Sequence, residues 1–267
     1  MILSKGARRA FAAITGVILL LMYIPLMLVV VNSFNTSQAF EWPPPGFTGE
    51  WWSRAIHNDG AREALWTSVQ VGIVATVVAA LLGTLLALAL SRYQFFGRTG
   101  VNLLVVLPIA LPGIITGIAL NNAFRGILDL RLSILTVTIA HSTFCIVTVF
   151  NNVAARLRQV GGNLEEASAD LGAGVWTTFR LVTFPQLRTA LVAGMLLSFA
   201  LSFDEIVVTT FTAGAGQDTL PLWIFNNMFR PNQAPIVNVV AVVMILISII
   251  PIWLAQRLSD DVTAAAP

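Results

Sequence analysis

The sequence is poor in charged and reactive residues, and each shortage excludes a class of protein. Only 10% of its 267 residues are charged, whereas an ordinary soluble domain has about 25%. Lys5 is the only lysine, so the chain has no glycine-rich nucleotide-binding loop, which requires a lysine after its last glycine. His57 and His141 are far apart and form no zinc-hydrolase motif. The single cysteine, Cys145, excludes a disulfide within the chain and indicates no redox compartment.

Apolar sequence, by contrast, is abundant. Hydrophobic residues make up 57% of the chain, and its mean hydropathy is +0.82. Several apolar runs approach the ~20 residues that a helix needs to span a bilayer. The first run exceeds the ~7–15 residues of a signal-peptide core, so it is expected to be retained. We therefore predict an all-α polytopic membrane protein with six transmembrane helices. The predicted spans are residues 11–31, 65–90, 101–123, 133–153, 189–211 and 236–256.

Basic residues are unevenly distributed between the segments that join these spans. With an internal amino terminus, the internal segments hold twice as many lysines and arginines as the external ones. This bias follows the positive-inside rule. It predicts that both termini and the loop between the fourth and fifth spans are cytoplasmic. The expected division is residues 1–63 for the first helix and an external segment, 64–256 for the transmembrane core with a loop at 154–188, and 257–267 for a disordered tail.

The loop at residues 163–185 is polar at its start and contains several glycines. Asn163, followed three residues later by Glu166, predicts a capping box with a helix beginning at Leu164. Gly172 is expected to end that helix. A second short helix is predicted over residues 175–182, and Pro185 is expected to end it before the next span.

The same loop contains a spaced motif: Glu-Ala-Ala, three residues, Gly, nine residues, then Ile-x-Leu-Pro. Three positions depart from this pattern and retain size or apolar character. The matching residues are Glu166, Ala167, Ser168, Gly172, Val182, Phe184 and Pro185. The loop resembles the cytoplasmic loop of permease subunits of ABC importers, which docks on a separate ATPase subunit. An ordinary amphipathic hairpin is the alternative. The resemblance implies ATPase-coupling roles for Glu165, Glu166, Ala167, Ser168, Asp170, Gly172 and Pro185.

The fifth predicted span has a face of small residues. Gly194, Ser198 and Ser202 recur every four residues, and Glu205 continues the stripe. Such a face is typical of helix packing or of a pore lining. Asp204 and Glu205 need water, a cation or an interfacial position, because a carboxylate in the bilayer is costly. The candidate substrate pathway is Ser198, Ser202, Asp204 and Glu205. The alternative for the two acids is pairing with an arginine of a neighbouring subunit.

Other spans carry packing signals. Ala79, Gly83 and Ala87 recur every four residues and favour close approach of a second helix. The third span contains Pro108, Pro112, Gly113 and Gly117, which indicate either a pathway or a packing kink. His141 is expected to form a hydrogen bond to a neighbouring helix.

Two further segments lie outside the predicted spans. The prolines at residues 43–45 exclude a helix there. Trp42, Trp51 and Trp52 are expected at the membrane–water boundary, with contact to an external partner as the alternative. A short surface helix is predicted over residues 222–229.

A second resemblance covers most of the chain after Leu65. Residues 202–205 (Ser-Phe-Asp-Glu) and 219–222 (Thr-Leu-Pro-Leu) are similar to permeases of the spermidine/putrescine branch of ABC importers. It implies a multi-pass protein of the bacterial cytoplasmic membrane that moves a small solute, best a polyamine, by alternating access. Related importers for another amine, an amino-acid-like solute or an opine remain the alternative. Other classes are an ATP-independent channel or carrier and a membrane-embedded enzyme.

This resemblance also implies the partners. They are two ATPase subunits, which hold the ATP and Mg, a second homologous permease in a heterodimer rather than a homodimer, an extracytoplasmic binding protein and the lipid bilayer. It implies no cofactor or metal in this chain, no catalytic residue and no nucleic-acid partner.

Overall fold

The computed structural model describes residues 4–38, 41–230 and 232–264, with side chains described up to residue 257. Within these ranges the chain is helical or loop, apart from an isolated bridge between Asn35 and Phe47. The all-α prediction is therefore confirmed. The chain divides into two compact units, Met1–Arg62 with Ile224–Leu246 and Glu63–Trp223 with Ile247–Pro267. Each unit is described by itself.

The first unit begins with α1, Lys5–Asn32, which contains the first predicted span. Ser4 caps this helix, since its Oγ accepts a hydrogen bond from the N–H of Ala7 at 3.2 Å. Pro25 lies within the helix, which continues beyond it. No residue in the most apolar stretch of α1 is buried, as expected of a helix whose surroundings are lipid rather than protein.

The segment after α1 folds around Trp51. It includes α2, Glu50–Ile56, and residues 43–46 are not helical, as predicted. The indole Nε1 of Trp51 donates to the backbone oxygen of Asn35 at 2.7 Å, and Trp51 is buried. Trp52 stacks on Phe34 with a centroid separation of 5.3 Å. Trp51 thus stabilises local packing, whereas Trp42 is exposed, and its position at the membrane–water boundary stays a prediction.

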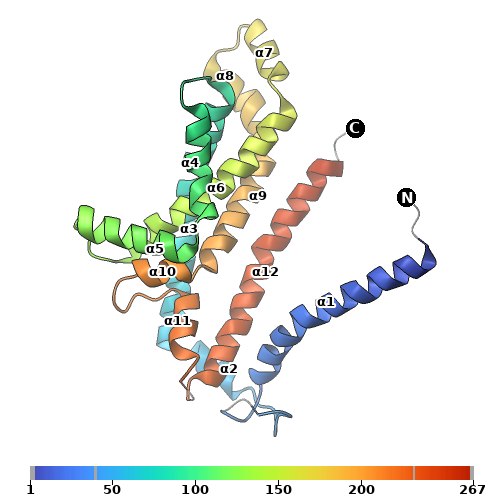
Figure 1. The fold of residues 1–267 in the computed structure, drawn as a ribbon, viewed down its shortest axis with the longest axis vertical. Coiled ribbons are helices and arrows are strands. Elements are labelled where there is room, and N and C mark those ends of the chain that lie inside the picture. The colour runs from blue at the N-terminus through green and yellow to red at the C-terminus, as the bar shows by residue number, and fades with distance from the viewer. Residues whose placement is uncertain (1–3, 39–40, 231, 265–267) are drawn as a thin grey trace. The chain divides into compact units, whose positions relative to one another are not determined.

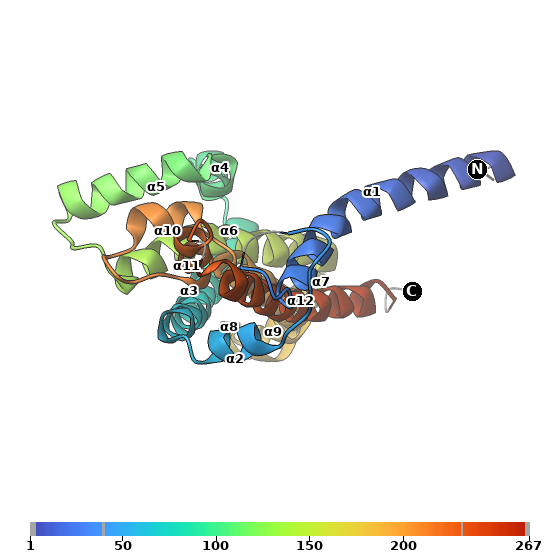
Figure 2. The ribbon, with the colours of Figure 1, turned by 90° about the horizontal axis from the view of Figure 1, so that it is seen from below.

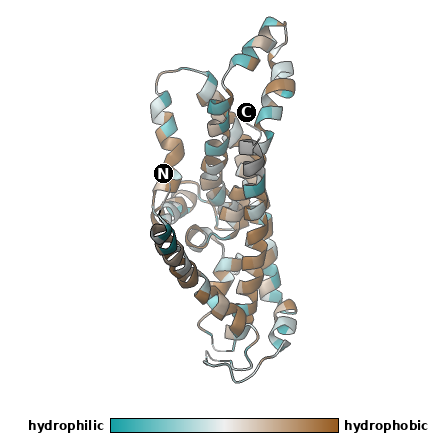
Figure 3. Ribbon diagram, turned by 90° about the vertical axis from the view of Figure 1, so that its right-hand side faces the viewer, coloured by the Kyte–Doolittle hydropathy of each residue, from teal (hydrophilic) through white to brown (hydrophobic). Residues whose placement is uncertain are grey.

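The second unit contains most of the long helices, and Figure 3 shows that hydrophobic residues predominate along them. Three helices cross a unit boundary: the first residues of α3 and the last residues of α11 belong to the first unit, and α12 begins there. The remaining helices after α2 are α3 (Asp59–Arg92), α4 (Arg98–Ala110), α5 (Gly113–Asn122), η1 (Ala123–Ile127), α6 (Ile134–Val160), α7 (Asn163–Asp170), α8 (Val175–Thr178), η2 (Phe179–Thr183), α9 (Phe184–Phe203), α10 (Val207–Thr212), α11 (Leu220–Asn227) and α12 (Ala234–Ala264).

The described residues contain five helices long and apolar enough to cross a membrane, or six spans if one bent pair is counted. That pair is the third predicted span, which is not one continuous helix. α4 and the segment Gly113–Ile127 meet at 107° (Figure 1). Pro112 causes the break, because it lacks an N–H and forces Leu111 into an extended conformation, with ψ 144°.

The core of the second unit lies along α6. A Cβ on Gly83 of α3 would come within 2.8 Å of the backbone oxygen of Ile146, and one on Gly194 of α9 within 3.3 Å of Val149 Cα. Ala79 and Ala87 are buried beside the same face. The predicted small-residue packing of the second span is therefore confirmed, because only glycine permits this helix separation.

α5 and α10 pack against each other, and the two helices lie side by side in Figures 1 and 2. The amide Nδ2 of Asn121 donates to the backbone oxygen of Phe211 at 2.5 Å. A Cβ on Gly117 would lie 2.7 Å from the Phe211 ring. Gly117 thus serves helix packing after the break.

One prediction near the carboxyl end is wrong, and another needs its bounds corrected. The tail after Arg257 was predicted to be disordered, but α12 continues through it to Ala264. Residues 265–267 lie outside the described residues. The short helix predicted around residues 222–229 is present as α11, Leu220–Asn227. It lies only partly at the surface, because Leu220, Leu222 and Trp223 are buried whereas Phe225 is exposed.

Candidate functional site

α7 begins directly after the carboxyl end of α6. Gly161 adopts φ +69°, which turns the chain sharply and leaves Gly162 at the N-cap of α7. The predicted capping box is therefore wrong: Asn163 is the first helical residue, and no side chain caps the helix. Glu165 and Glu166 lie in the first turn, where carboxylates interact favourably with the helix dipole.

Gly172 ends α7, as predicted. It adopts φ +79°, a left-handed conformation that glycine takes without strain. The N–H of Ala173 donates to the oxygen of Ser168 at 3.1 Å, and the N–H of Gly172 donates to the oxygen of Ala169 at 2.9 Å. These two bonds define a Schellman motif, which fixes the direction in which the chain leaves the helix.

Glu165 attaches α7 to two other helices. Its Oε1 pairs with Arg92 at the end of α3 and accepts a hydrogen bond of 2.6 Å from the Thr183 hydroxyl in η2. Arg92 also donates to Thr183 Oγ1 at 3.0 Å. Three segments that are distant in sequence are therefore joined by one small polar cluster, Arg92–Glu165–Thr183.

The second half of the loop differs from the predicted helix over 175–182. α8 is a single turn that passes into the π-helix η2 and then into α9, so Val175–Phe203 forms one continuous helix. Pro185 does not end a helix but lies in the first turn of α9, where a missing N–H is tolerated. The Ser168 and Thr178 hydroxyls, 2.9 Å apart, connect α7 to α8.

The outer surface of this turn is apolar and exposed. Leu171 is 89% exposed, Val175 83% and Trp176 71%. Leu164 and Leu181 are also exposed. We call these five side chains the α7–α8 surface; Figure 1 shows α7 and α8 at one end of the second unit, beyond α4 and α6. An exposed apolar cluster on an otherwise polar loop is typical of a protein-interaction site.

The predicted coupling residues fall into two groups, one exposed to solvent and one partly buried. Glu166, Ala167, Asp170, Gly172 and Pro185 are exposed and could touch a partner. Glu165 and Ser168 are partly buried and bind within the chain. The structure therefore brings all seven to one end of the unit but distinguishes accessible residues from anchoring ones.

Ser198 and Ser202 face α6. The Ser198 hydroxyl donates to the oxygen of Cys145 at 3.2 Å, and Ser202 Oγ lies 2.8 Å from His141 Nδ1. His141 Nε2 lies 2.8 Å from the Thr209 hydroxyl of α10. The hydrogen bond predicted for His141 is confirmed. Both serines are buried in this helix contact, so they match the packing alternative for the small-residue face.

The two acids lie at a break rather than within a span. α9 ends at Phe203, so Glu205 does not continue its stripe as predicted. Glu205 Oε1 instead accepts a hydrogen bond of 2.8 Å from the N–H of Val208 in the first turn of α10. Asp204 is exposed. Of the four predicted pathway residues, Asp204 is thus the most accessible in this chain.

Sequence reasoning missed Arg92, Thr183 and Thr209. Arg92 is separated from Glu165 by 73 residues, so no local spacing relates them. Thr209 lies four residues after Glu205, but the broken helix aims its hydroxyl at α6. A basic residue ending one apolar run and an acid beginning a loop were the only available signals.

The fold and the site define a class: a polytopic helical membrane protein with an exposed apolar turn at one end of its second unit. The family follows from comparison. Residues 79–264 match the family described as "Binding-protein-dependent transport system inner membrane component", and the chain belongs to it. It is therefore a transport subunit of the inner membrane.

Individual relatives match along nearly the whole chain. The sequence is 33% identical over 243 residues to the spermidine/putrescine transport system permease protein PotC of Escherichia coli (strain K12), covering 91% of this chain and 90% of PotC. It is 30% identical over 260 residues to the putative 2-aminoethylphosphonate transport system permease protein PhnV of Salmonella choleraesuis (strain SC-B67), covering 93% and 97%.

The fold also occurs in a solved transporter. A chain in the crystal structure of a bacterial alginate ABC transporter, in complex with an alginate pentasaccharide-bound periplasmic protein, superposes with a TM-score of 0.71. The match covers 97% of this chain and 96% of that one at 12% identity. At this identity the likeness concerns the fold alone.

Proposed function

We propose that this chain is a permease subunit of an ATP-driven importer that carries a polyamine such as spermidine or putrescine into the cytoplasm. The likeness to PotC supports this solute class. PhnV, at similar identity, favours a second candidate, another amine-bearing solute. The observation that carries the ATP-driven mechanism is the exposed α7–α8 surface, because it offers an apolar docking site for a separate ATPase.

The contacts beneath that surface explain how docking would act on the spans. A partner that moves α7 also moves Glu165, whose partners Arg92 and Thr183 belong to α3 and to the helix that continues into α9. Ser168 and Thr178 keep α7 and α8 together during that motion. Closure of the ATPase subunits would thus change the angle of α3 and α9, and the pathway would open alternately to each side.

The proposed assembly contains two ATPase subunits, a second homologous permease and an extracytoplasmic binding protein. ATP and Mg belong to the ATPase subunits. The excess of basic residues in the segments predicted to be internal supports a cytoplasmic position for α7 and for both termini. The heterodimeric arrangement rests on the resemblance to the spermidine/putrescine branch.

Within the pathway, we assign contact with the cationic solute to Asp204 rather than to Ser198 or Ser202. Asp204 is exposed at the break between α9 and α10, whereas the serines bind α6. Glu205 holds the start of α10 and would orient the break. Asp204→Asn should lower uptake of spermidine while the complex still assembles; unchanged uptake would remove Asp204 from the pathway.

The test of the function is affinity purification of the chain from its native membrane, followed by an ATPase assay. We expect recovery of an ATPase, a second permease and a binding protein, with hydrolysis stimulated by binding protein loaded with spermidine. Stimulation by 2-aminoethylphosphonate instead would establish the second candidate. Recovery of the chain without an ATPase would favour an ATP-independent carrier and contradict the proposal.

A matched pair of variants locates the docking site within that experiment. Trp176→Ala removes an exposed side chain of the α7–α8 surface, and Trp66→Ala removes an exposed tryptophan of α3. Interface tryptophans often contribute 2 kcal/mol or more, so ATPase recovery should fall by roughly tenfold or more in Trp176→Ala. Equal recovery with both variants would show that the ATPase docks elsewhere.

A further inference from the structure

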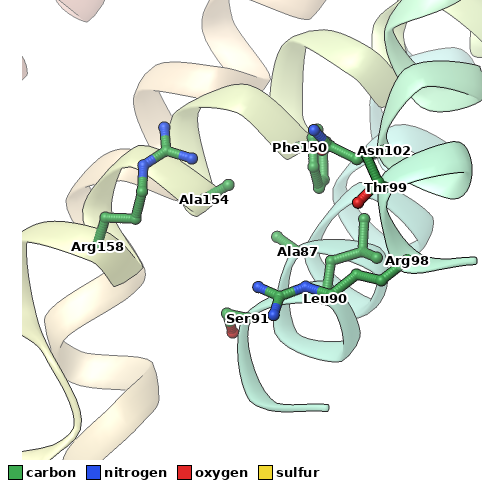
Figure 4. A pocket seen from close by; sticks show the side chains of 9 residues that line it. All are labelled: Ala87, Leu90, Ser91, Arg98, Thr99, Asn102, Phe150, Ala154 and Arg158. Atoms are coloured by element: carbon green, nitrogen blue, oxygen red, sulfur yellow. The ribbon is translucent and has the colours of Figure 1, made fainter. Parts of the chain in front are cut away.

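A pocket of 310 Å³ lies where α3, α4 and α6 end or begin, on the same end of the second unit as α7. Figure 4 shows its side chains, which come from all three helices. Its apolar side consists of Ala87 and Leu90 from α3 and Phe150 and Ala154 from α6. Its polar side consists of Ser91, Arg98, Thr99, Asn102 and Arg158. The pocket is therefore amphipathic, and it lies at the depth where the apolar runs give way to arginines.

The two arginines of the pocket lack a counter-charge. Arg92 pairs with Glu165, and Arg156 donates to the backbone oxygen of Gln186 at 3.0 Å. Within the described residues, the side chains of Arg98 and Arg158 have no ion-pair or hydrogen-bond partner. No acidic residue lines the pocket. An anion in the cavity would therefore be attracted by two guanidinium groups and repelled by no carboxylate of the lining.

Helix geometry adds to the positive potential. α4 begins at Arg98, and no side chain caps its amino terminus, so the positive end of its dipole lies at the pocket rim. Gly97, at the N-cap, adopts φ +88° and brings the loop sharply into the helix. Thr99 and Asn102, in the first turns of α4, supply hydrogen-bond donors on the same rim.

We propose that this pocket binds a phosphate-bearing anion, with Arg98 and Arg158 as its charged ligands. Guanidinium groups bind phosphate oxygens in a planar, bidentate manner. The apolar side of the pocket fits the glycerol and upper acyl carbons of an anionic phospholipid, and basic pockets between transmembrane helices bind such headgroups. A free phosphate could use the arginines but not the apolar side. The pocket thus connects bilayer composition to the helix ends that carry α7.

The experiment uses the purified full-length permease in its complex, in detergent, and measures lipid binding by native mass spectrometry. The probes are a phosphatidylglycerol and a phosphatidylcholine with identical acyl chains. We expect preferential retention of phosphatidylglycerol. Removing both charges in Arg98→Gln/Arg158→Gln should weaken its binding roughly 10- to 30-fold, since each basic residue near an anionic headgroup contributes about a fivefold factor.

The matched control is Arg180→Gln/Arg188→Gln. It removes two arginines from the same end of the unit that do not line the pocket, so phosphatidylglycerol binding should change by less than about threefold. A second variant, Arg98→Lys/Arg158→Lys, keeps the charge but loses the bidentate geometry. It should bind the lipid several-fold more weakly than the original chain, and it serves if the glutamine variant does not assemble.

Competition with inorganic phosphate distinguishes the sources of the anion. If inorganic phosphate leaves the lipid bound, the pocket is a phospholipid site; if it displaces the lipid, or binds where no lipid does, the pocket is a free-anion site. Three results would overturn the proposal: equal binding of both lipids with no phosphate binding, unchanged phosphatidylglycerol binding in both pocket variants, or equal weakening in the Arg180/Arg188 control.

Discussion

The helix α6 and the α7–α8 turn that follows it differ in where their side chains find contacts. Along α6, small residues let α3 and α9 approach closely, and polar groups such as His141 find partners inside the bundle. In the turn, Leu171 and Trp176 face outward, and only a few polar contacts hold the backbone. The small and polar residues cited for α6 thus find their partners within one chain, whereas the turn has an apolar surface that a second chain can complete.

Gly83→Leu tests the bundle side of this comparison and should have the largest effect. Even a Cβ at this position would lie 2.8 Å from a backbone oxygen of α6, so α3 and α6 must separate. Overpacking a core costs about 1–3 kcal/mol, and a whole leucine against backbone costs more. We expect near-complete loss of the monodisperse peak in fluorescence-detected size-exclusion chromatography.

The control for that variant is Gly16→Leu in α1. Gly16 is also a glycine within a long apolar helix, but a Cβ there would meet nothing within 4 Å. Its elution profile should match that of the original chain. Similar profiles for the two leucine variants would mean that α3 and α6 do not depend on close approach.

Gly172→Ala tests the turn and should leave the bundle intact. A left-handed conformation costs a residue with a Cβ about 1–2 kcal/mol, so the Schellman motif loosens and the docking direction changes. Solute-stimulated ATPase activity and transport should fall roughly tenfold, with an unchanged melting temperature. The control is Gly174→Ala, since Gly174 has φ −72° and open space around it. Equal activity of the two alanine variants would argue against this turn as the coupling element.

Ser202→Ala tests how much a buried hydrogen bond between α9 and α6 contributes to stability. It leaves His141 Nδ1 buried without its partner, which costs about 1–3 kcal/mol. The melting temperature of the purified chain should decrease, while ATPase recovery stays normal. Ser142→Ala is the control, because that buried hydroxyl bonds only to Thr138 of its own helix. A larger decrease in melting temperature for Ser142→Ala than for Ser202→Ala would contradict the stabilising role of the Ser202–His141 hydrogen bond.

Glu165→Gln should have the smallest effect. The pair with Arg92 is about a third exposed, so its contribution is about 1 kcal/mol or less. We expect hydrogen exchange of the α7 amides to accelerate about threefold in the isolated permease. Glu166→Gln is the control, since Glu166 is exposed, and its exchange rates should not change. Equal rates in both variants would show that Glu165 does not hold α7 in place.

The sequence was informative wherever the determining signal is local. Apolar runs locate the spans, and the four-residue spacing of Ala79, Gly83 and Ala87 predicts the face of α3 that packs against α6. Gly172 ends α7 for a reason that its immediate neighbours fix. In each case the residues involved lie within one or two helical turns of one another.

Where the determinant is tertiary, prediction failed. Hydropathy continues through Phe211, so it could not indicate that α9 ends at Phe203 or that Glu205 binds the start of α10. Pro112 indicated a break in the third span. It could not indicate the angle of 107° between α4 and the following segment, which depends on how α5 packs against α10. Arg92 and Glu165 are related only by the folded chain.

The continuity of α8, η2 and α9 has a mechanical consequence. Val175–Phe203 is a single helix of 29 residues, about 40 Å long at ~1.5 Å per residue. Trp176 lies near one end, and Ser202 lies near the other. The helix is therefore a lever: a tilt of about 5° around its middle displaces each end by roughly 2 Å in opposite directions. A small rotation imposed on the docking turn would be enough to shift the contacts of His141 and the position of Asp204.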